Sequence, residues 1–428
     1  MLPANSNRPR RIALVDCNNF YVSCERVFHP AWNNIPVGVL SNNDGCIIAR
    51  SNELKAAGIP MGAPYFKHKK QLEAMKAVIV SSNYTLYGDM SARVMHTLGQ
   101  QAPEIEVYSI DEAWLDLTGI RPGELDALGR EIVMRTHQNT GIPVSMGIAP
   151  TKTLAKIANR ICKKHDVPGR VFNLSNADSL EIILAGVAVA DIWGIGRRLA
   201  EKLNKQRIYT ALDLRNADPD NMRMRYGVVM QRLILELRGV ACLGKDDVKP
   251  KQQIIASRSF GERVTSKHSL VEAVALHATR AGEKLRAQHS VCGSIQVSIR
   301  SGQHNIREPY FSNSCVIRFP TPTADTRQLI TASSNGIHRI FKPGIRYAKA
   351  GVMLFDITPA SQAQRSLFDT VENAPSSRLM TTIDRINHQF GKHTLFFAVE
   401  GTRKSWAMQR NRMTQAFTTK WPEIPEAY

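Results

Sequence analysis

The chain has 428 residues, and its 43% hydrophobic content is enough for packed cores, which excludes a disordered polycation. It has no run of about 18 apolar residues and no apolar stretch near its start, so we expect neither a membrane span nor a signal peptide. The formal charge of +19 predicts a polyanionic partner such as nucleic acid, although a basic enzyme without one would have the same charge. Fifteen Lys and Arg against five Asp and Glu lie in residues 251–351, so the positive charge is concentrated there.

The first part of the chain alternates short apolar runs with helical patterns over residues 12–165, which predicts an α/β or α+β catalytic unit. Strands are expected at 12–17, 37–40 and 143–149 and as a pair around a tight turn in 105–117, with helices in 18–28 and around 125–132. Residues 44–64 are rich in Gly and Ala and predict a small, loosely built subdomain. The seven cysteines are scattered without a C-x-x-C pair, which predicts reduced thiols in a cytoplasmic protein.

The later part of the chain has a different order of elements. The pattern predicts a strand (254–264), a helix (269–288), two strands (293–300 and 314–319), a helix (325–341) and a strand (349–357). This is the β-α-β-β-α-β arrangement of a split β-α-β unit. Polar residues over 358–378 predict a flexible linker, followed by a short helical and extended remainder. The whole chain is therefore expected to be a multidomain α+β protein.

Three carboxylates stand next to predicted strands. Asp16 ends the first apolar strand, and Asp111 and Glu112 lie between the two strands of 105–117. Three oxygen donors brought together would suit Mg²⁺, and two such ions support phosphoryl transfer. The alternative is that Asp16 caps the following helix and the other two are turn residues. Neighbours on a regular strand point to opposite faces, so both Asp111 and Glu112 can face a metal only if the hairpin bends there.

A basic helix is predicted after residue 149. Its cations recur every four residues, at Lys152, Lys156, Arg160 and Lys164. No acidic residue four positions along the helix offsets them, so an external anion explains the pattern better than a solvated face does.

Two shorter motifs point to binding partners. Gly194 and Gly196, followed by Arg197, resemble a helix-hairpin-helix turn, in which backbone N–H groups approach a DNA phosphate. In the predicted linker, Gln364, Leu367 and Phe368 form a short peptide that could dock in an apolar pocket. Chance placement of apolar residues is the alternative for the second motif.

Five segments together resemble the Y-family translesion DNA polymerases, and among these the UmuC type. They are LVDCNNFYVSCE, SNNDGCIIARSNELKAAGIPMG, SSNYTLYGDMS, YSIDEAWLDLTG and GIAPTKTLAKIAN, in this order along the chain. The resemblance extends from about Ile12 to the C-terminal region. It implies a right-hand polymerase with a palm (10–25 and 80–175), fingers (26–79), a helical thumb (176–242), a little finger (250–355) and a C-terminal region (358–428) with a clamp motif.

The resemblance also implies roles for individual residues. Asp16 and Asp111 would bridge two Mg²⁺ ions, Glu112 would complete the site that activates the primer 3′-OH, and the Cys17 backbone carbonyl would add a ligand. Tyr21, five residues after Asp16, matches the steric gate that excludes a ribose 2′-OH.

Two lysines match positions that hold the triphosphate, Lys156 and Lys55. The chain departs from the family near the second of them, because Asn52-x-x-Lys55 stands where many members have Tyr-x-x-Arg. Lys cannot make the bidentate phosphate contact of Arg, so the role of the fingers differs here. Asn19 also replaces a Tyr that some members have.

The resemblance implies error-prone synthesis opposite damaged template in the SOS response, without proofreading, by a cytoplasmic, nucleoid-associated enzyme. Its implied partners are primer-template DNA and dNTPs, the bacterial sliding clamp, a UmuD′-like dimer and the RecA filament. Two other classes remain as alternatives: a two-metal nuclease that uses the same carboxylates, and a catalytically inactive DNA-binding repair factor. The intact Asp16, Asp111 and Glu112 argue against the second.

Overall fold

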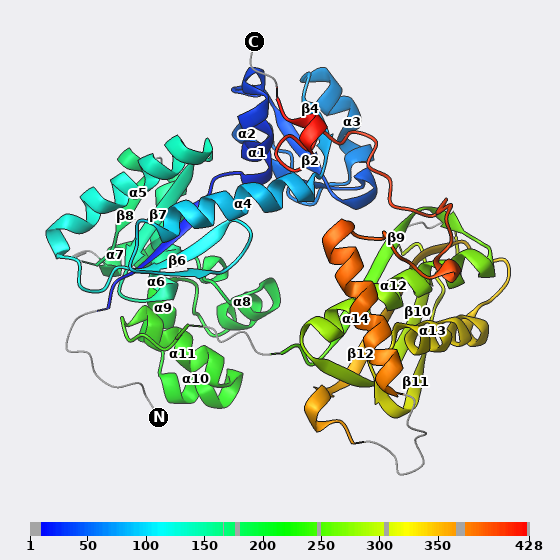
Figure 1. The fold of residues 1–428 in the computed structure, drawn as a ribbon. Coiled ribbons are helices and arrows are strands. Elements are labelled where there is room, and N and C mark those ends of the chain that lie inside the picture. The colour runs from blue at the N-terminus through cyan, green and yellow to red at the C-terminus, as the bar shows by residue number, and fades with distance from the viewer. Residues whose placement is uncertain are drawn as a thin grey trace. The chain divides into compact units, whose positions relative to one another are not determined.

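The computed structural model describes residues 10–165, 167–175, 180–245, 250–303, 308–364 and 373–425 (Figure 1). These residues belong to two compact units. Unit 1 contains residues 1–41, 45–246 and 412–428, and unit 2 contains residues 42–44 and 247–411. Within the described ranges, every helix is too short or too polar to cross a membrane.

The main sheet of unit 1 has five strands in the order β5-β6-β1-β7-β8. Their bounds are β1 Ile12–Cys17, β5 Glu104–Val107, β6 Glu112–Asp116, β7 Val144–Ala149 and β8 Val171–Asn173. The central strand β1 runs antiparallel to both β6 and β7, while β7 and β8 are parallel. The predicted strands at 12–17, 105–117 and 143–149 are thus confirmed, and they meet in one sheet.

The two faces of this sheet pack against different helices, because successive side chains on a strand point to opposite sides. Ala13 and Val15 share a buried core with residues of α1 (Phe20–Phe28), α4 (Tyr84–Gly99) and α5 (Leu125–Thr140). Ile12 and Leu14 share a different core with α6 (Lys152–Lys164). By the same alternation, Asp16 belongs to the α6 face.

Unit 1 also contains a small three-stranded sheet and a group of short helices. The sheet has the order β3-β2-β4 and packs with two helices around seven buried apolar residues, as the Gly/Ala-rich sequence predicts. Its elements are β2 Val37–Leu40, β3 Ile47–Arg50, β4 Val78–Ser81, α2 Asn52–Ala56 and α3 Tyr65–Ala74. The short helices are α7 Leu180–Ala185, α8 Arg197–Asn204, α9 Ala211–Asn216, α10 Pro219–Tyr226 and α11 Val228–Leu237, and their core is continuous with that under α6.

Unit 2 has the predicted β-α-β-β-α-β order. Its elements are β9 Ile254–Val264, α12 Lys267–Ala287, β10 Ser290–Ser301, β11 Ser312–Thr323, α13 Thr326–Ile340 and β12 Tyr347–Pro359. The strands form an antiparallel sheet in the order β11-β10-β12-β9, and the two helices share one apolar core with it. The β-α-β-β-α-β prediction is therefore confirmed.

The region predicted as a linker is more structured than the sequence indicated. Strand β12 extends to Pro359, a 3₁₀ turn follows at Ala360–Gln362, and α14 begins at Asn373 and ends at Phe390. Arg286 of α12 holds α14 by a bidentate ion pair with Asp384, at 2.6 and 2.7 Å. The predicted linker bounds of 358–378 are thus wrong at both ends, because β12 and α14 each extend into that range.

All seven cysteines are free, as predicted. Burial raises the pKa of six of these thiols: Cys17, Cys24, Cys162, Cys242, Cys292 and Cys315.

Candidate active site

The central strands bring two of the predicted carboxylates directly opposite each other. Asp16 of β1 pairs with Glu112 of β6 in the antiparallel ladder, and both follow the alternation that faces α6. Asp111 lies just before β6, in the turn that joins it to β5. Its backbone oxygen accepts a hydrogen bond from the Cys17 N–H at 2.8 Å, and its carboxylate accepts one from Ser109 Oγ at 2.6 Å. The hairpin therefore bends at Asp111, as the metal hypothesis requires.

Two lysines of α6 neutralise these carboxylates. Lys163 forms a close ion pair with Asp16, and Lys156 Nζ lies 3.1 Å from both carboxylate oxygens of Glu112. Burial raises the pKa of Asp16 to about 6, Lys163 opposes this rise, and the negative charges of Glu112 and Asp111 add to it. The site is thus a partly buried cluster of carboxylates, two of which form ion pairs with lysines of α6.

The donor chemistry of this cluster fits Mg²⁺, since all three side chains offer carboxylate oxygens and repel one another. Among the described residues, however, no group of three His, Cys, Asp or Glu side chains is arranged to hold a metal ion. Asp16, Glu112 and Asp111 are instead bonded to Lys163, Lys156 and Ser109, respectively. The residues that would hold a metal are close together, and lysines supply the compensating charge.

The basic helix differs from the sequence-based interpretation. Lys152 is buried and forms an ion pair with Glu106 at 2.8 Å, and Arg160 pairs with Asp191 at 2.6 Å. The expectation that these cations need an external anion is therefore wrong for both, because acidic partners come from other elements of unit 1.

Lys156 is also enclosed. Its ammonium lies 4.7 Å from the centre of the Tyr108 ring and 5.2 Å from that of Trp193, besides its ion pair with Glu112. The sequence analysis missed Lys163, which contacts Asp16. Its position seven residues after Lys156, two helical turns on the same face, is the signal that could have found it.

The residues that depart from the family pattern contact one another. Lys55 Nζ donates to Asn19 Oδ1 at 2.5 Å, and Asn19 Nδ2 donates to Asn52 Oδ1 at 3.0 Å. Burial lowers the pKa of Lys55, and the nearby charges of Arg50 and Lys163 lower it further. Helix α2 therefore places a second cation, Lys55, near Lys163, and Asn19 holds it.

Tyr21 of α1 lies within a cluster of aromatic rings. Its ring stacks on Tyr87 of α4, with centroids 4.5 Å apart and planes inclined by 15°, and meets Tyr84 edge-on at 6.0 Å. The side chain is half-buried, so one part of the ring remains accessible. Packing thus restricts the ring that the resemblance identifies as the sugar gate.

The hairpin motif forms the start of α8. Gly194 has a φ of 89°, which favours glycine, and Gly196 caps the helix that begins at Arg197. The Arg197 side chain is 87% exposed and only weakly paired with Glu201, at 3.9 Å. The turn and its cation are therefore available to an anion.

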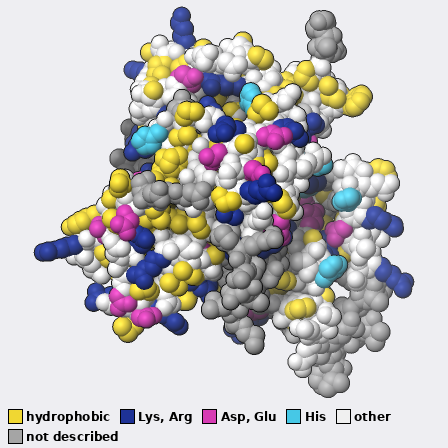
Figure 2. Space-filling view, turned by 90° about the vertical axis from the view of Figure 1, so that its left-hand side faces the viewer, with side chains coloured by type: hydrophobic (Ala, Val, Ile, Leu, Met, Phe, Trp, Pro, Cys, Tyr) yellow, Lys and Arg dark blue, Asp and Glu magenta, His cyan; other side chains and the backbone are white. Residues whose placement is uncertain are grey.

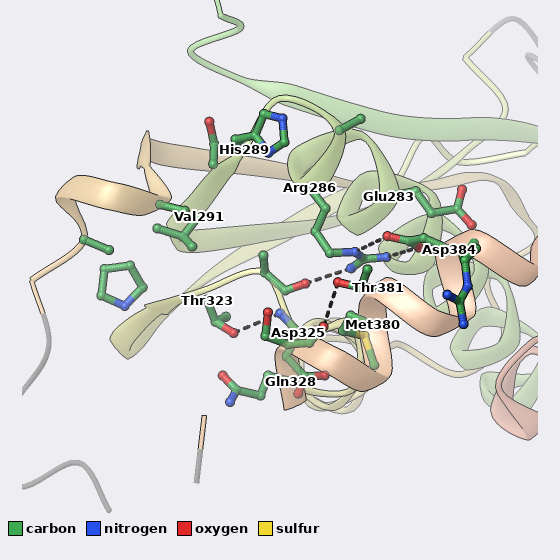
Figure 3. A pocket seen from close by; sticks show the side chains of 18 of the residues that line it. Glu283, Arg286, His289, Val291, Thr323, Asp325, Gln328, Met380, Thr381 and Asp384 are labelled. Carbon is green, nitrogen blue, oxygen red and sulfur yellow. Dashed lines mark hydrogen bonds and ion pairs between the residues drawn. The ribbon is translucent and has the colours of Figure 1, made fainter. Parts of the chain in front are cut away.

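In the clamp motif only the first residue can be placed. Gln364 is exposed, while Leu367 and Phe368 lie outside the described residues. Close to this position in the chain, unit 2 encloses a cavity of about 930 Å³ between α12, the end of β11 and α14 (Figure 3). Arg286 lies at its wall, where it also donates to Thr326 Oγ1 at 2.9 Å.

On the face shown in Figure 2, Lys and Arg side chains are spread among hydrophobic and uncharged ones rather than gathered in one patch. This view alone therefore does not single out a path for DNA.

Comparison with known proteins gives matches along most of the chain. The impB/mucB/samB family model matches residues 15–160, and the model of the C-terminal domain of that family matches residues 251–367. Protein UmuC of Salmonella typhimurium is 46% identical over 419 residues, which cover 96% of this chain and 99% of the relative. The chain belongs to the impB/mucB/samB family. A domain of unknown function accounts for residues 377–427.

Other relatives agree with this family membership. Protein ImpB of Salmonella typhimurium is 43% identical over 420 residues, covering 97% of this chain and 99% of the relative. DNA polymerase IV of Moorella thermoacetica is 26% identical over 413 residues, covering 91% and 96%. A solved Y-family DNA polymerase chimera of Dbh and Dpo4 shares the fold with a TM-score of 0.62 at 21% identity, over 81% of this chain and 99% of that one. The impB/mucB/samB member described here is thus a UmuC-type Y-family DNA polymerase, which confirms the predicted fold class and enzyme class.

Proposed function

We propose that this polymerase adds dNTPs to a primer 3′-OH opposite damaged template in the SOS response, by two-metal nucleotidyl transfer and without proofreading. The observation that carries the proposal is the register that sets Asp16 opposite Glu112, with Asp111 in the adjoining turn. Lys163 and Lys156 form ion pairs with Asp16 and Glu112, respectively. Two Mg²⁺ ions, held by these carboxylates and the Cys17 carbonyl, would lower the pKa of the attacking hydroxyl and neutralise phosphate charge.

The cations around the site would bind the triphosphate. Burial is the main cause of the lowered pKa of Lys55, and repulsion by the nearby charges of Arg50 and Lys163 adds to it. A phosphate chain would relieve this repulsion, and Lys163 would exchange its bond with Asp16 for one with phosphate. Lys156, which the sequence also suggests for this role, would do so only by leaving Glu112 and its aromatic neighbours.

Each proposed binding function is assigned to a particular part of the chain. Tyr21 would exclude a 2′-OH by steric clash with the incoming sugar. Gly194, Gly196 and Arg197 would contact a DNA phosphate, and the basic unit 2 would act as the DNA-binding little finger. Gln364, Leu367 and Phe368 would tether the enzyme to the sliding clamp, and the UmuD′-like dimer and RecA filament are proposed as further partners.

Primer extension tests the proposal. A labelled primer on a template with an abasic site should lengthen with dNTPs and Mg²⁺, whereas a nuclease would shorten it and an inactive repair factor would leave it unchanged. Asp16→Asn should abolish extension with little change in DNA binding. Asp89→Asn is the matched control, since Asp89 is an acid of α4 that forms an ion pair with Arg93 at 2.8 Å. Extension by Asp16→Asn at the native rate would refute the site.

A further inference from the structure

The C-terminal segment, residues 412–425, belongs to unit 1, where it packs beside β4 and against α1 and α4 (Figure 1). Backbone hydrogen bonding joins Arg412 O to the Ser81 N–H of β4 at 3.0 Å. Phe417 is buried and stacks on Phe28 of α1, with centroids 4.6 Å apart and planes inclined by 3°. Among the matching family models, the domain of unknown function is the one that covers this segment.

Side chains at the start of α4 hold this segment by hydrogen bonds. Asn83, which precedes α4, donates from Nδ2 to the Gln415 backbone oxygen at 3.0 Å and to Thr414 Oγ1 at 3.2 Å. The Thr414 hydroxyl in turn donates to Glu25 Oε1 at 3.2 Å. The segment is therefore bonded to both α1, through Glu25, and α4, through Asn83.

Glu25 connects this contact to the sugar gate. It is fully buried, and its Oε1 also accepts a hydrogen bond from the Tyr87 hydroxyl at 2.7 Å. Tyr87 is fully buried as well, and its ring is the surface on which Tyr21 stacks. In the described part of the chain, Glu25 Oε2 has no hydrogen-bond partner, so Oε1 alone anchors the carboxylate.

We propose that the C-terminal segment positions the sugar gate, through contacts from Thr414 to Glu25, from Glu25 to Tyr87 and from Tyr87 to Tyr21. Thr414, Glu25 and Tyr87 are positioning residues that touch no substrate. The inference rests on the proposed role of Tyr21 as the gate. Without the Thr414 hydroxyl, the buried carboxylate keeps one bond instead of two and gains freedom to rotate. The Tyr87 ring is then held less firmly. Tyr21, which stacks on it, therefore moves aside more readily when the incoming sugar carries a 2′-OH.

The test is sugar selectivity, measured as kcat/KM for a dNTP divided by that for the rNTP of the same base. Thr414→Val should lower this ratio by about threefold to tenfold, the range that one buried hydrogen bond accounts for. Thr414→Ser, which restores the hydroxyl, should keep the native ratio. Tyr87→Phe should lower the ratio too, and adding Thr414→Val to it should cause little further loss, because the connection is already broken.

Tyr21→Ala separates the failure of this inference from failure of the gate. If Tyr21→Ala lowers selectivity but folded Thr414→Val does not, the connection is overturned and the gate stands. If Tyr21→Ala leaves selectivity unchanged, both are overturned. Equal loss of dNTP and rNTP insertion in Thr414→Val would show a merely structural role and would also overturn the inference. Should Thr414→Val not fold, Tyr87→Phe decides alone, and native selectivity in that variant refutes the connection.

Discussion

Glu236 offers a direct test of how the helices after residue 180 support the candidate active site. It lies in α11, is fully buried, and accepts three backbone hydrogen bonds. Its Oε2 accepts from the Thr153 N–H at 3.0 Å, and its Oε1 accepts from those of Cys242 and Leu243 at 2.7 and 3.1 Å. Thr153 lies in the first turn of α6, the helix that carries Lys156 and Lys163.

Glu236→Gln changes this site with almost no change in shape. The amide nitrogen of Gln cannot accept a hydrogen bond, so if its oxygen faces Cys242 and Leu243, the Thr153 N–H is left without a partner. A buried unpaired N–H costs about 1–3 kcal/mol. Loss of a negative charge at the start of α6 adds about 0.3–1 kcal/mol. We therefore expect the free energy of unfolding to fall by roughly 1–4 kcal/mol.

Scanning calorimetry of the full chain measures this effect, with the transition of unit 1 as the readout. Glu201→Gln is the matched control, because Glu201 is 64% exposed and its nearest cation, Arg197, lies 3.9 Å away. Its free energy of unfolding should change by less than about 0.5 kcal/mol. A Glu236→Gln protein as stable as this control would refute the reasoning.

Three further predictions follow from unit 1 and unit 2. Lys163→Met should raise KM for dNTPs about tenfold, as loss of one charged hydrogen bond to phosphate does; steady-state extension with an unchanged KM would contradict its phosphate role. Gly147→Ala should destabilise unit 1 by about 1–3 kcal/mol or more, because the added Cβ would lie 2.2 Å from the Asn159 backbone nitrogen of α6, and an unchanged melting temperature would show that α6 can move freely. Burial, aided by nearby cations, lowers the pKa of His277 to about 3, so the unfolded chain binds its proton first and stability should fall as pH drops from about 6.5 towards 3. His277→Leu should remove up to about 1.4 kcal/mol per pH unit of that slope, and an identical slope in both proteins would argue against it.

Local patterns in the sequence predicted the parts of the fold that depend on nearby residues. The strand at 12–17, the tight turn within 105–117 and the order of elements in unit 2 are all confirmed, since each depends on short-range periodicity or turn chemistry. The ion pairs of α6 could not be predicted in the same way. Lys152 pairs with Glu106, which lies 46 positions away in the sequence. Periodicity shows which face of the helix Lys152 occupies, but not which residues cover that face.

The contact between Thr414 and Glu25 is a still longer-range case. These residues are 389 positions apart, and although Glu25 ends the segment LVDCNNFYVSCE, nothing in that segment indicates a contact with Thr414. Only packing of the C-terminal segment on α1 and α4 brings them together. The proposed positioning of Tyr21 depends on such tertiary contacts, whereas the motif that singles out Tyr21 is short and local.

The burial of the cysteines has a consequence for the chemistry of damaged cells. Oxidants and alkylating agents that damage DNA also attack sulfur, and they react with the thiolate far faster than with the protonated thiol. Cys17 adjoins Asp16 and is buried, and burial raises its pKa, so its sulfur stays protonated and shielded. The same holds for Cys24, on the helix that carries Tyr21. In its proposed role opposite damaged template, this polymerase would thus keep the sulfur atoms beside Asp16 and Tyr21 in their least reactive form.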